Sequence, residues 1–229
     1  MFFNFQYLIF MIPAFIIMGI TSWYVRSSYS KWSQVRATSG LTGAQAAQRL
    51  ISASGLMGVR IQTIAGELTD NYDPRTKMLN LSQGVASQPS VASLAIAAHE
   101  LGHAMQDAED YAPLRFRAAL VPAVNIGSNL GWILIMIGLF LNFTELAWLG
   151  IMVFSGGAVF ALATLPVEFD ASARAKRMLV DSGLVSDQNE VGGVNSVLNA
   201  AALTYVAALI TAVMQILYYV TLVGGRRRD

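Results

Sequence analysis

Both histidines of the chain, His99 and His103, lie four residues apart, and Glu100 directly follows the first. On a helix, residues i and i+4 share one face about one turn apart, so two imidazole nitrogens can bind the same Zn²⁺ ion. Glu100 would then lie beside the open position of the metal, where a carboxylate can act as a base toward water. The spacing is typical of a zinc hydrolase, and a pair of structural helix histidines is the alternative interpretation.

The residues around this motif predict the helix that the metal geometry requires. Ser90, which follows a proline, is a suitable N-cap, and the Ala-rich residues 91–98 favour a helix. The polar residues 106–110 are expected to form the exposed end of this helix, before Pro113. The two histidines would therefore lie in the middle of a helix.

The composition indicates a membrane protein. Hydrophobic residues make up 55% of the 229-residue chain, charged residues 13%, and the mean hydropathy is +0.50, outside the range of soluble domains. Apolar stretches long enough to cross a bilayer lie at 2–25, 118–141, 146–165 and about 200–223. We therefore expect an α-helical integral membrane protein with about four transmembrane helices. The net charge of +1 argues against nucleic acid as a partner.

The distribution of basic residues predicts which side of the membrane holds the motif. Residues 26–117 carry most of the Lys and Arg, whereas the connection 142–145 has none. Residues 26–117 and 166–199 should therefore face the cytosol. A complete fourth span would put the basic residues 226–228 outside, so a partly inserted last helix is the alternative.

These patterns divide the chain into five parts. They are a transmembrane anchor (1–25), a cytosolic part with the histidine motif (26–117), a transmembrane hairpin (118–165), a second cytosolic segment (166–199), and a C-terminal transmembrane helix with a basic tail (200–229).

The cytosolic part should contain a small zincin-like α+β layer before the histidine helix. The Thr42–Gln45 sequence resembles a capping box that opens a helix, which Gly55 would close. Residues 59–63 alternate like a strand, and residues 68–72 and 77–82 flank a turn sequence. In zinc proteases an edge strand can bind a substrate backbone by strand addition, and a supporting role is the equal alternative.

A catalytic zinc needs a third protein ligand, and the chain has no cysteine to supply one. Asp107 is about 12 Å along the helix from His99, too far to share an ion. Glu145 would lie on the opposite side of the membrane. Glu168 returns to the cytosolic surface after the third span, where we expect it in the first turn of a new helix. Asp170 is the alternative ligand, or a partner that orients a histidine N–H.

The tetrahedral oxyanion of a hydrolysis reaction also needs a donor, and both histidines are already used. The candidates are Asn71, Tyr72, Arg75 and Tyr205. Tyr205 lies in an apolar helix, where a core tyrosine with a satisfied hydroxyl is the alternative.

Five segments together resemble the YugP-type family of bacterial neutral zinc membrane peptidases, and the resemblance covers nearly the whole chain. It implies a membrane-bound metallopeptidase with a zinc cofactor. More distantly the chain is similar to HtpX-type and prenyl-protein membrane proteases, whose third ligand is a Glu in a Glu-Phe-x-x-Asp-like segment. Here Ser172 stands where that segment has its acidic residue. The segments are 68–76, 98–104, 111–117, 166–174 and 198–206.

We therefore expect a zinc-dependent endopeptidase with one Zn²⁺ per chain, multi-pass in the bacterial plasma membrane, with its active site facing the cytosol. Its partners would be a membrane-protein or peptide substrate, the lipid bilayer, and a regulatory membrane partner or a second copy of the chain. A catalytically silent metal-binding scaffold is the alternative, although such a site has no use for Glu100. A transporter is disfavoured because residues 118–141 and 146–165 contain no ionisable side chain.

Overall fold

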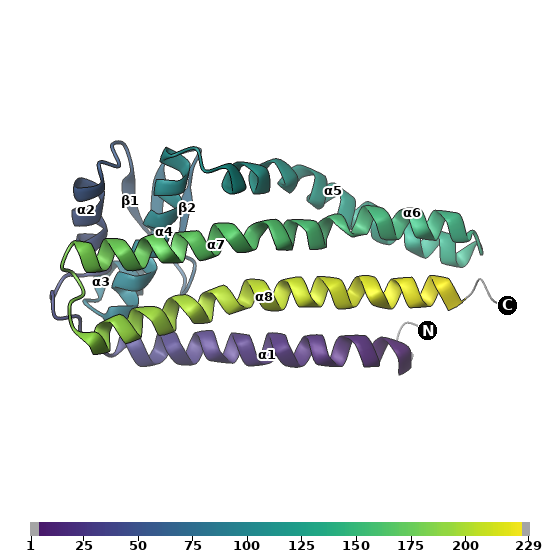
Figure 1. Ribbon diagram of the computed structural model, residues 1–229, viewed down its shortest axis with the longest axis horizontal. Coiled ribbons are helices and arrows are strands. Elements are labelled where there is room, and N and C mark those ends of the chain that lie inside the picture. Colours follow the sequence, from purple (N-terminus) through teal and green to yellow (C-terminus); the bar gives the residue numbers. More distant parts are fainter. Residues whose placement is uncertain (1–4, 226–229) are drawn as a thin grey trace. The chain divides into compact units, whose positions relative to one another are not determined.

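The computed structural model describes residues 5–225, so the start of the first predicted span and the basic tail 226–228 lie outside the described residues. Helices dominate the described chain, and three short strands lie between the second and third of them (Figure 1). In chain order the elements are α1 (Phe5–Ser33), α2 (Gly43–Ser54), β1 (Arg60–Ile64), β2 (Asn71–Asp73), β3 (Met78–Ser82), α3 (Gln83–Ser87), α4 (Val91–Ala108), α5 (Ala112–Phe140), α6 (Thr144–Phe154), α7 (Gly156–Asp181) and α8 (Gln188–Gly225).

Four helical stretches among the described residues are long and apolar enough to cross a membrane, which confirms the predicted fold class. They are α1, α5, the consecutive helices α6 and α7 taken together, and α8. Large hydrophobic side chains of these stretches are exposed, as a lipid environment requires. The chain is therefore a membrane protein.

The third stretch continues further than the sequence suggested. Pro166 does not end a helix, because α7 runs through it to Asp181. The expectation that Glu168 lies in the first turn of a new helix is thus wrong. Proline removes one backbone hydrogen bond and kinks a helix, but helices of membrane proteins tolerate it where neighbouring groups compensate. Glu168 consequently lies on the same helix that forms the end of the third apolar stretch.

The predicted α+β layer is present. Thr42 caps α2 with a complete capping box, and Gly55 ends the helix in the left-handed conformation at φ 65°. The predicted hairpin is β2 paired antiparallel with β3, and β1 adds to β3 in parallel, so the order is β1-β3-β2. In the connecting turn Asp73 Oδ1 accepts a hydrogen bond from the Arg75 backbone N–H at 3.0 Å.

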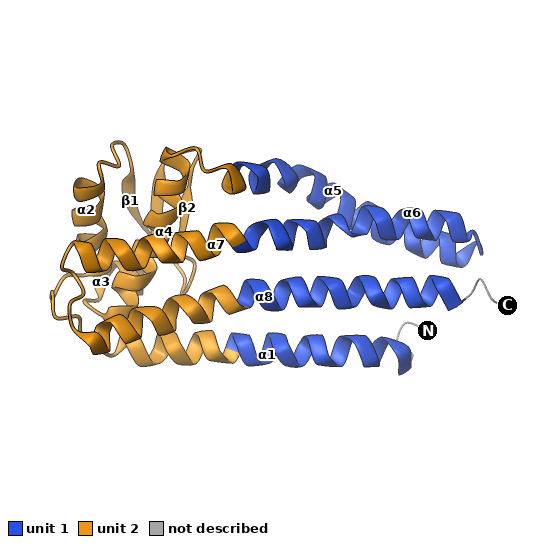
Figure 2. Cartoon of the chain, viewed as in Figure 1, with its two compact units in different colours: residues 1–22, 115–165, 204–229 blue, residues 23–114, 166–203 orange. Residues whose placement is uncertain are grey.

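The chain forms two compact units (Figure 2). Unit 1 comprises residues 1–22, 115–165 and 204–229, and unit 2 comprises 23–114 and 166–203. The core of unit 2 contains many alanines together with fully buried leucines, including Leu50, Leu79, Leu94 and Leu179. All three strands and the histidine helix α4 belong to unit 2.

Candidate metal centre

The helix that carries the two histidines begins as the sequence predicts. Ser90 is the N-cap of α4, and its Oγ accepts a hydrogen bond from the Ser93 backbone N–H at 3.1 Å. The alanines that follow are buried in the core of unit 2. The apolar side of α4 therefore packs in the core. His99 and His103, in the middle of the helix, remain partly accessible.

A glycine allows α7 to approach this helix closely. A Cβ atom added at Gly102 would lie 2.5 Å from the backbone oxygen of Ala171, a distance that real Cβ atoms essentially never show. The two backbones are thus in direct contact at this point. Glu168 lies about one turn before Ala171 on α7, so the close approach brings its carboxylate toward the histidine face of α4.

Three potential ligand atoms gather at this contact. Glu168 Oε2 lies 3.3 Å from His99 Nε2 and 3.5 Å from His103 Nε2. All three donor atoms lie within 4.8 Å of one another, and no other group of His, Asp or Glu in the described part of the chain offers such a cluster. The Glu168 side chain is only 3% exposed, whereas the two histidines are 13% and 14% exposed.

The donor set and its spacing fit zinc. Ligands at about 2.0–2.1 Å from a tetrahedral ion are separated from one another by roughly 3.4 Å. The distances of 3.3 and 3.5 Å between Glu168 and the histidines match this value. Two imidazoles and one carboxylate are also a ligand set of catalytic zinc sites that keep a fourth position open.

The surrounding charges favour a cation at this place. Burial lowers the pKa of His103, but the hydrogen bond that its ring donates to Glu168 and the charges of Glu100 and Glu168 raise this pKa by more, so it lies above its usual value. Glu100 is half-buried on α4. The carboxylates that stabilise positive charge on the imidazole would equally stabilise a metal ion.

Each histidine has a further polar neighbour at Nδ1. Gln106 Oε1 lies 3.0 Å from His103 Nδ1, and Ser172 Oγ lies 3.3 Å from His99 Nδ1. Ser172 thus lies beside a candidate metal ligand.

Gln106 is a polar residue beside the candidate metal ligands that the sequence analysis does not identify. We expected it at the exposed end of α4, but its side chain is fully buried. The expectation was wrong because it was based on the polarity of residues 106–110 and not on their helical spacing. Gln106 follows His103 by three residues, so both side chains lie on the same face of the helix. That spacing is the signal that could have identified it.

Asp170 is connected to His103 through the side chain of Gln106. Its Oδ2 accepts hydrogen bonds from Gln106 Nε2 at 2.8 Å and from Arg174 Nε at 2.6 Å, and Gln106 in turn contacts His103. Asp170 does not belong to the cluster of three ligand atoms.

The oxyanion candidates are distributed over both units. The Tyr72 hydroxyl donates a hydrogen bond to Asp107 Oδ2 at 2.8 Å, and burial together with this bond raises the pKa of Tyr72. Asn71 Nδ2 donates to the Thr69 carbonyl oxygen. Arg75 pairs with Asp73 and is 91% exposed. Tyr205 belongs to α8 in unit 1.

Comparisons with known proteins agree with this metal centre. Residues 7–224 match the model of a family described as "Putative neutral zinc metallopeptidase". The chain is also similar to the "Putative membrane protease YugP" of Bacillus subtilis (strain 168), with 41% identity over 213 residues, which cover 91% of this chain and 94% of that protein. No solved structure matches the chain.

Proposed function

The chain belongs to this family of neutral zinc metallopeptidases, and we propose that it is a membrane-embedded endopeptidase that hydrolyses membrane or membrane-proximal proteins. His99, His103 and Glu168 would hold one zinc ion per chain, and Glu100 would be the general base. The observation that carries the proposal is the cluster of three potential ligand atoms from α4 and α7. Glu100 directly follows one of these ligands on α4.

A zinc ion bound there would lower the pKa of a water molecule and polarise the scissile carbonyl group. The reaction adds the oxygen of water to the carbonyl carbon and breaks the bond between that carbon and the amide nitrogen. The Glu100 carboxylate accepts one proton of the water and delivers it to the leaving nitrogen. Glu100 is suited to this exchange because it is half-buried, directly follows His99, and lies on the histidine helix.

Strand β2 supports a peptide as substrate. It is the last strand of the β1-β3-β2 sheet, and its Tyr72 contacts Asp107 on α4, so this edge of the sheet lies beside the histidine helix. An extended peptide can add to such an edge through backbone hydrogen bonds. We propose that the substrate backbone pairs with β2 while its scissile bond lies at the metal centre.

The distribution of basic residues supports a cytosolic active site in the plasma membrane of a bacterium. Arg26, Lys31 and Arg36 follow the apolar part of the first span, and Arg115 and Arg117 precede that of the second. Substrates would then be cut in cytosolic segments or close to the inner surface of the membrane.

The test is Glu100→Gln, which keeps the shape of the side chain and removes the base. In the full-length protein the turnover of a cleaved substrate should fall by about 10²–10⁴-fold while bound zinc is retained. New protein N-termini in the membrane fraction, compared between cells with wild-type protein and cells with the variant, identify the substrates. The matched control is Glu67→Gln, an exposed residue outside the site. A Glu100→Gln protein with wild-type cleavage contradicts the proposal.

A further inference from the structure

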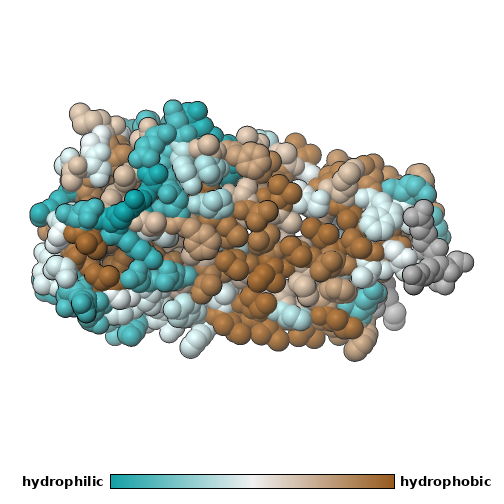
Figure 3. Space-filling view, viewed as in Figure 1, coloured by the Kyte–Doolittle hydropathy of each residue, from teal (hydrophilic) through white to brown (hydrophobic). Residues whose placement is uncertain are grey.

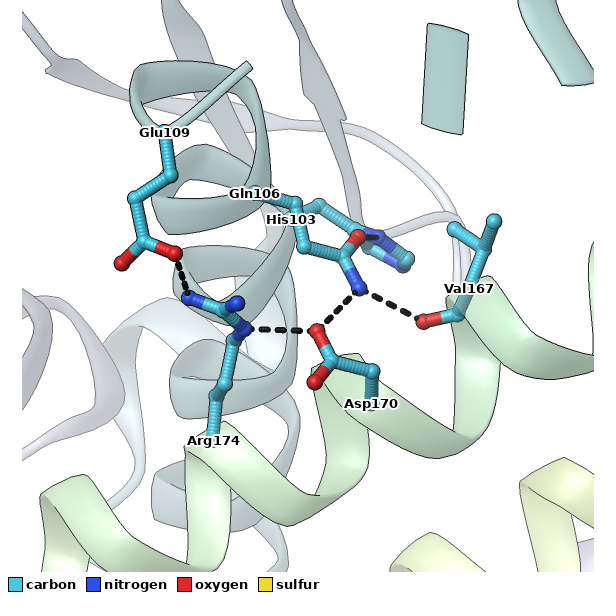
Figure 4. A network of polar contacts seen from close by, with 6 residues as sticks. All are labelled: His103, Gln106, Glu109, Val167, Asp170 and Arg174. Atoms are coloured by element: carbon cyan, nitrogen blue, oxygen red, sulfur yellow. Dashed lines mark hydrogen bonds and ion pairs between the residues drawn. The ribbon is translucent and has the colours of Figure 1, made fainter. Parts of the chain in front are cut away.

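We propose that Gln106 is a positioning residue that keeps a proton on His103 Nδ1 and thereby reserves His103 Nε2 for the metal. The inference rests on the proposed zinc site and concerns how the chain prepares one of its ligands. The observation behind it is a continuous series of hydrogen bonds between α4 and α7 (Figure 4).

The orientation of the Gln106 amide is determined by two acceptors. Its Nε2 donates to the Val167 backbone oxygen at 2.8 Å and to Asp170 Oδ2 at 2.8 Å. The reverse orientation would place the amide oxygen against these two oxygens, which is electrostatically unfavourable, and would leave a fully buried amino group without acceptors there. Gln106 Oε1 must therefore face His103.

This orientation of the amide determines which ring nitrogen of His103 carries a proton. Gln106 Oε1 can only accept, so at 3.0 Å from His103 Nδ1 it requires an N–H at that nitrogen. On the other side of the ring, His103 Nε2 faces Glu168 Oε2 at 3.5 Å. The ring therefore keeps its proton at Nδ1 and offers Nε2 to the metal.

A chain of ion pairs fixes the Asp170 carboxylate that orients Gln106. Arg174 Nε donates to Asp170 at 2.6 Å, and Arg174 Nη1 donates to Glu109 Oε2 at 2.7 Å. Glu109 is the C-cap residue of α4, so the series of contacts begins on α4, crosses to α7 and returns to the end of α4 (Figure 4). The Arg174 side chain is 12% exposed, which limits the competition from water.

His99 has no comparable amide acceptor at its Nδ1 among the described residues. Ser172 Oγ lies at the longer distance of 3.3 Å from His99 Nδ1, and a hydroxyl can rotate to donate or to accept. Ser172 thus does not decide which nitrogen of His99 carries a proton. The proposal therefore predicts a larger effect of removing the Gln106 amide than of removing the Ser172 hydroxyl.

Two measurements on the full-length protein test the proposal. In the first, ¹⁵N-labelled histidine without an affinity tag gives signals from two rings only, which the His99→Ala variant assigns. His103 Nδ1 should carry a proton in both the zinc-free and the zinc-loaded protein. A zinc-free ring protonated at Nε2 alone, or a zinc-loaded ring with an unprotonated Nδ1, overturns the proposal. The zinc-free spectrum gives this answer even if the chain binds no zinc.

In the second measurement, zinc affinity is determined by competition with a chelator. Gln106→Met keeps the volume of the side chain but loses its hydrogen bonds, and should weaken zinc binding by about 10–100-fold, with Ser172→Ala weakening it less. The control is Leu94→Met, another fully buried position of α4 without polar contacts. Wild-type affinity in Gln106→Met, or an equal loss in Leu94→Met, overturns the proposal. Zinc binding without hydrolysis in the wild-type protein would instead contradict the proposed function.

Discussion

The two compact units bury different kinds of side chain. Unit 2 has a large core of alanine and leucine and encloses polar groups such as Glu168 and Gln106. Unit 1 has a small buried cluster, including Ile135, Ala147 and Tyr219, and exposes many large hydrophobic side chains. Figure 3 shows this contrast on one face, with hydrophobic residues gathered over unit 1 and hydrophilic residues over unit 2. Lipid contact thus explains the surface of unit 1, whereas internal polar contacts define unit 2.

Both units nevertheless use glycine for the close approach of helices. In unit 1 a Cβ added at Gly138 would lie 2.5 Å from the Ala147 backbone nitrogen, so α5 and α6 touch there. In unit 2 the contact of Gly102 with Ala171 brings Glu168 to the histidines. Small residues at helix contacts are typical of membrane proteins. A close glycine contact thus joins two apolar helices in unit 1 and brings the candidate metal ligands together in unit 2.

The largest expected effect is the loss of zinc affinity when a candidate metal-binding residue of unit 2 is replaced. Glu168→Ala removes one of three ligands and should weaken zinc binding by more than about 100-fold, whereas Asp170→Ala acts only through Gln106 and should cost about 10–100-fold. Zinc titrations of the two purified variants check this order. The reverse order would make Asp170 the ligand.

The glycine contacts provide a sharper comparison of the units. Gly102→Ala and Gly138→Ala each insert a methyl group against backbone and should each destabilise the protein by about 1–3 kcal/mol. Only Gly102→Ala should also weaken zinc binding, because only that contact brings Glu168 to the histidines. Thermal unfolding in detergent and zinc affinity are measured on both variants. A Gly102→Ala protein with wild-type zinc affinity would show that the approach of α7 is not required for the site.

The substitutions with the smallest expected effect on the protein test which side of the membrane the candidate site faces. Single cysteines at Ser87 in α3 of unit 2 and at Thr144 at the start of α6 in unit 1 add one thiol each to a chain that has none. On intact cells a membrane-impermeant thiol reagent should label the cysteine at 144 and leave the one at 87 unlabelled. Labelling after lysis is the control for the accessibility of position 87. Labelling of position 87 on intact cells would move the active site to the outer side.

The sequence predicted much of this comparison for physical reasons. Apolar stretches of sufficient length identify the membrane helices, and the Thr42 and Ser90 caps identify helix starts, because these signals are local. The chain beyond Pro166 was misjudged because helix continuation depends on neighbouring groups. The spacing of Gln106 from His103 is a local signal of a shared helix face, but the burial of Gln106 depends on Asp170, 64 residues further along the chain, which local patterns do not encode.

Zinc content tests the central claim most directly. The wild-type protein, purified without chelators, should contain about one zinc per chain, as a single three-ligand site requires. His99→Ala and His103→Ala should lose this zinc, while Glu100→Gln should retain it, because Glu100 acts on water and does not bind the metal. Metal analysis of the four proteins decides the question: full zinc in the His99→Ala protein would contradict the assignment of the site.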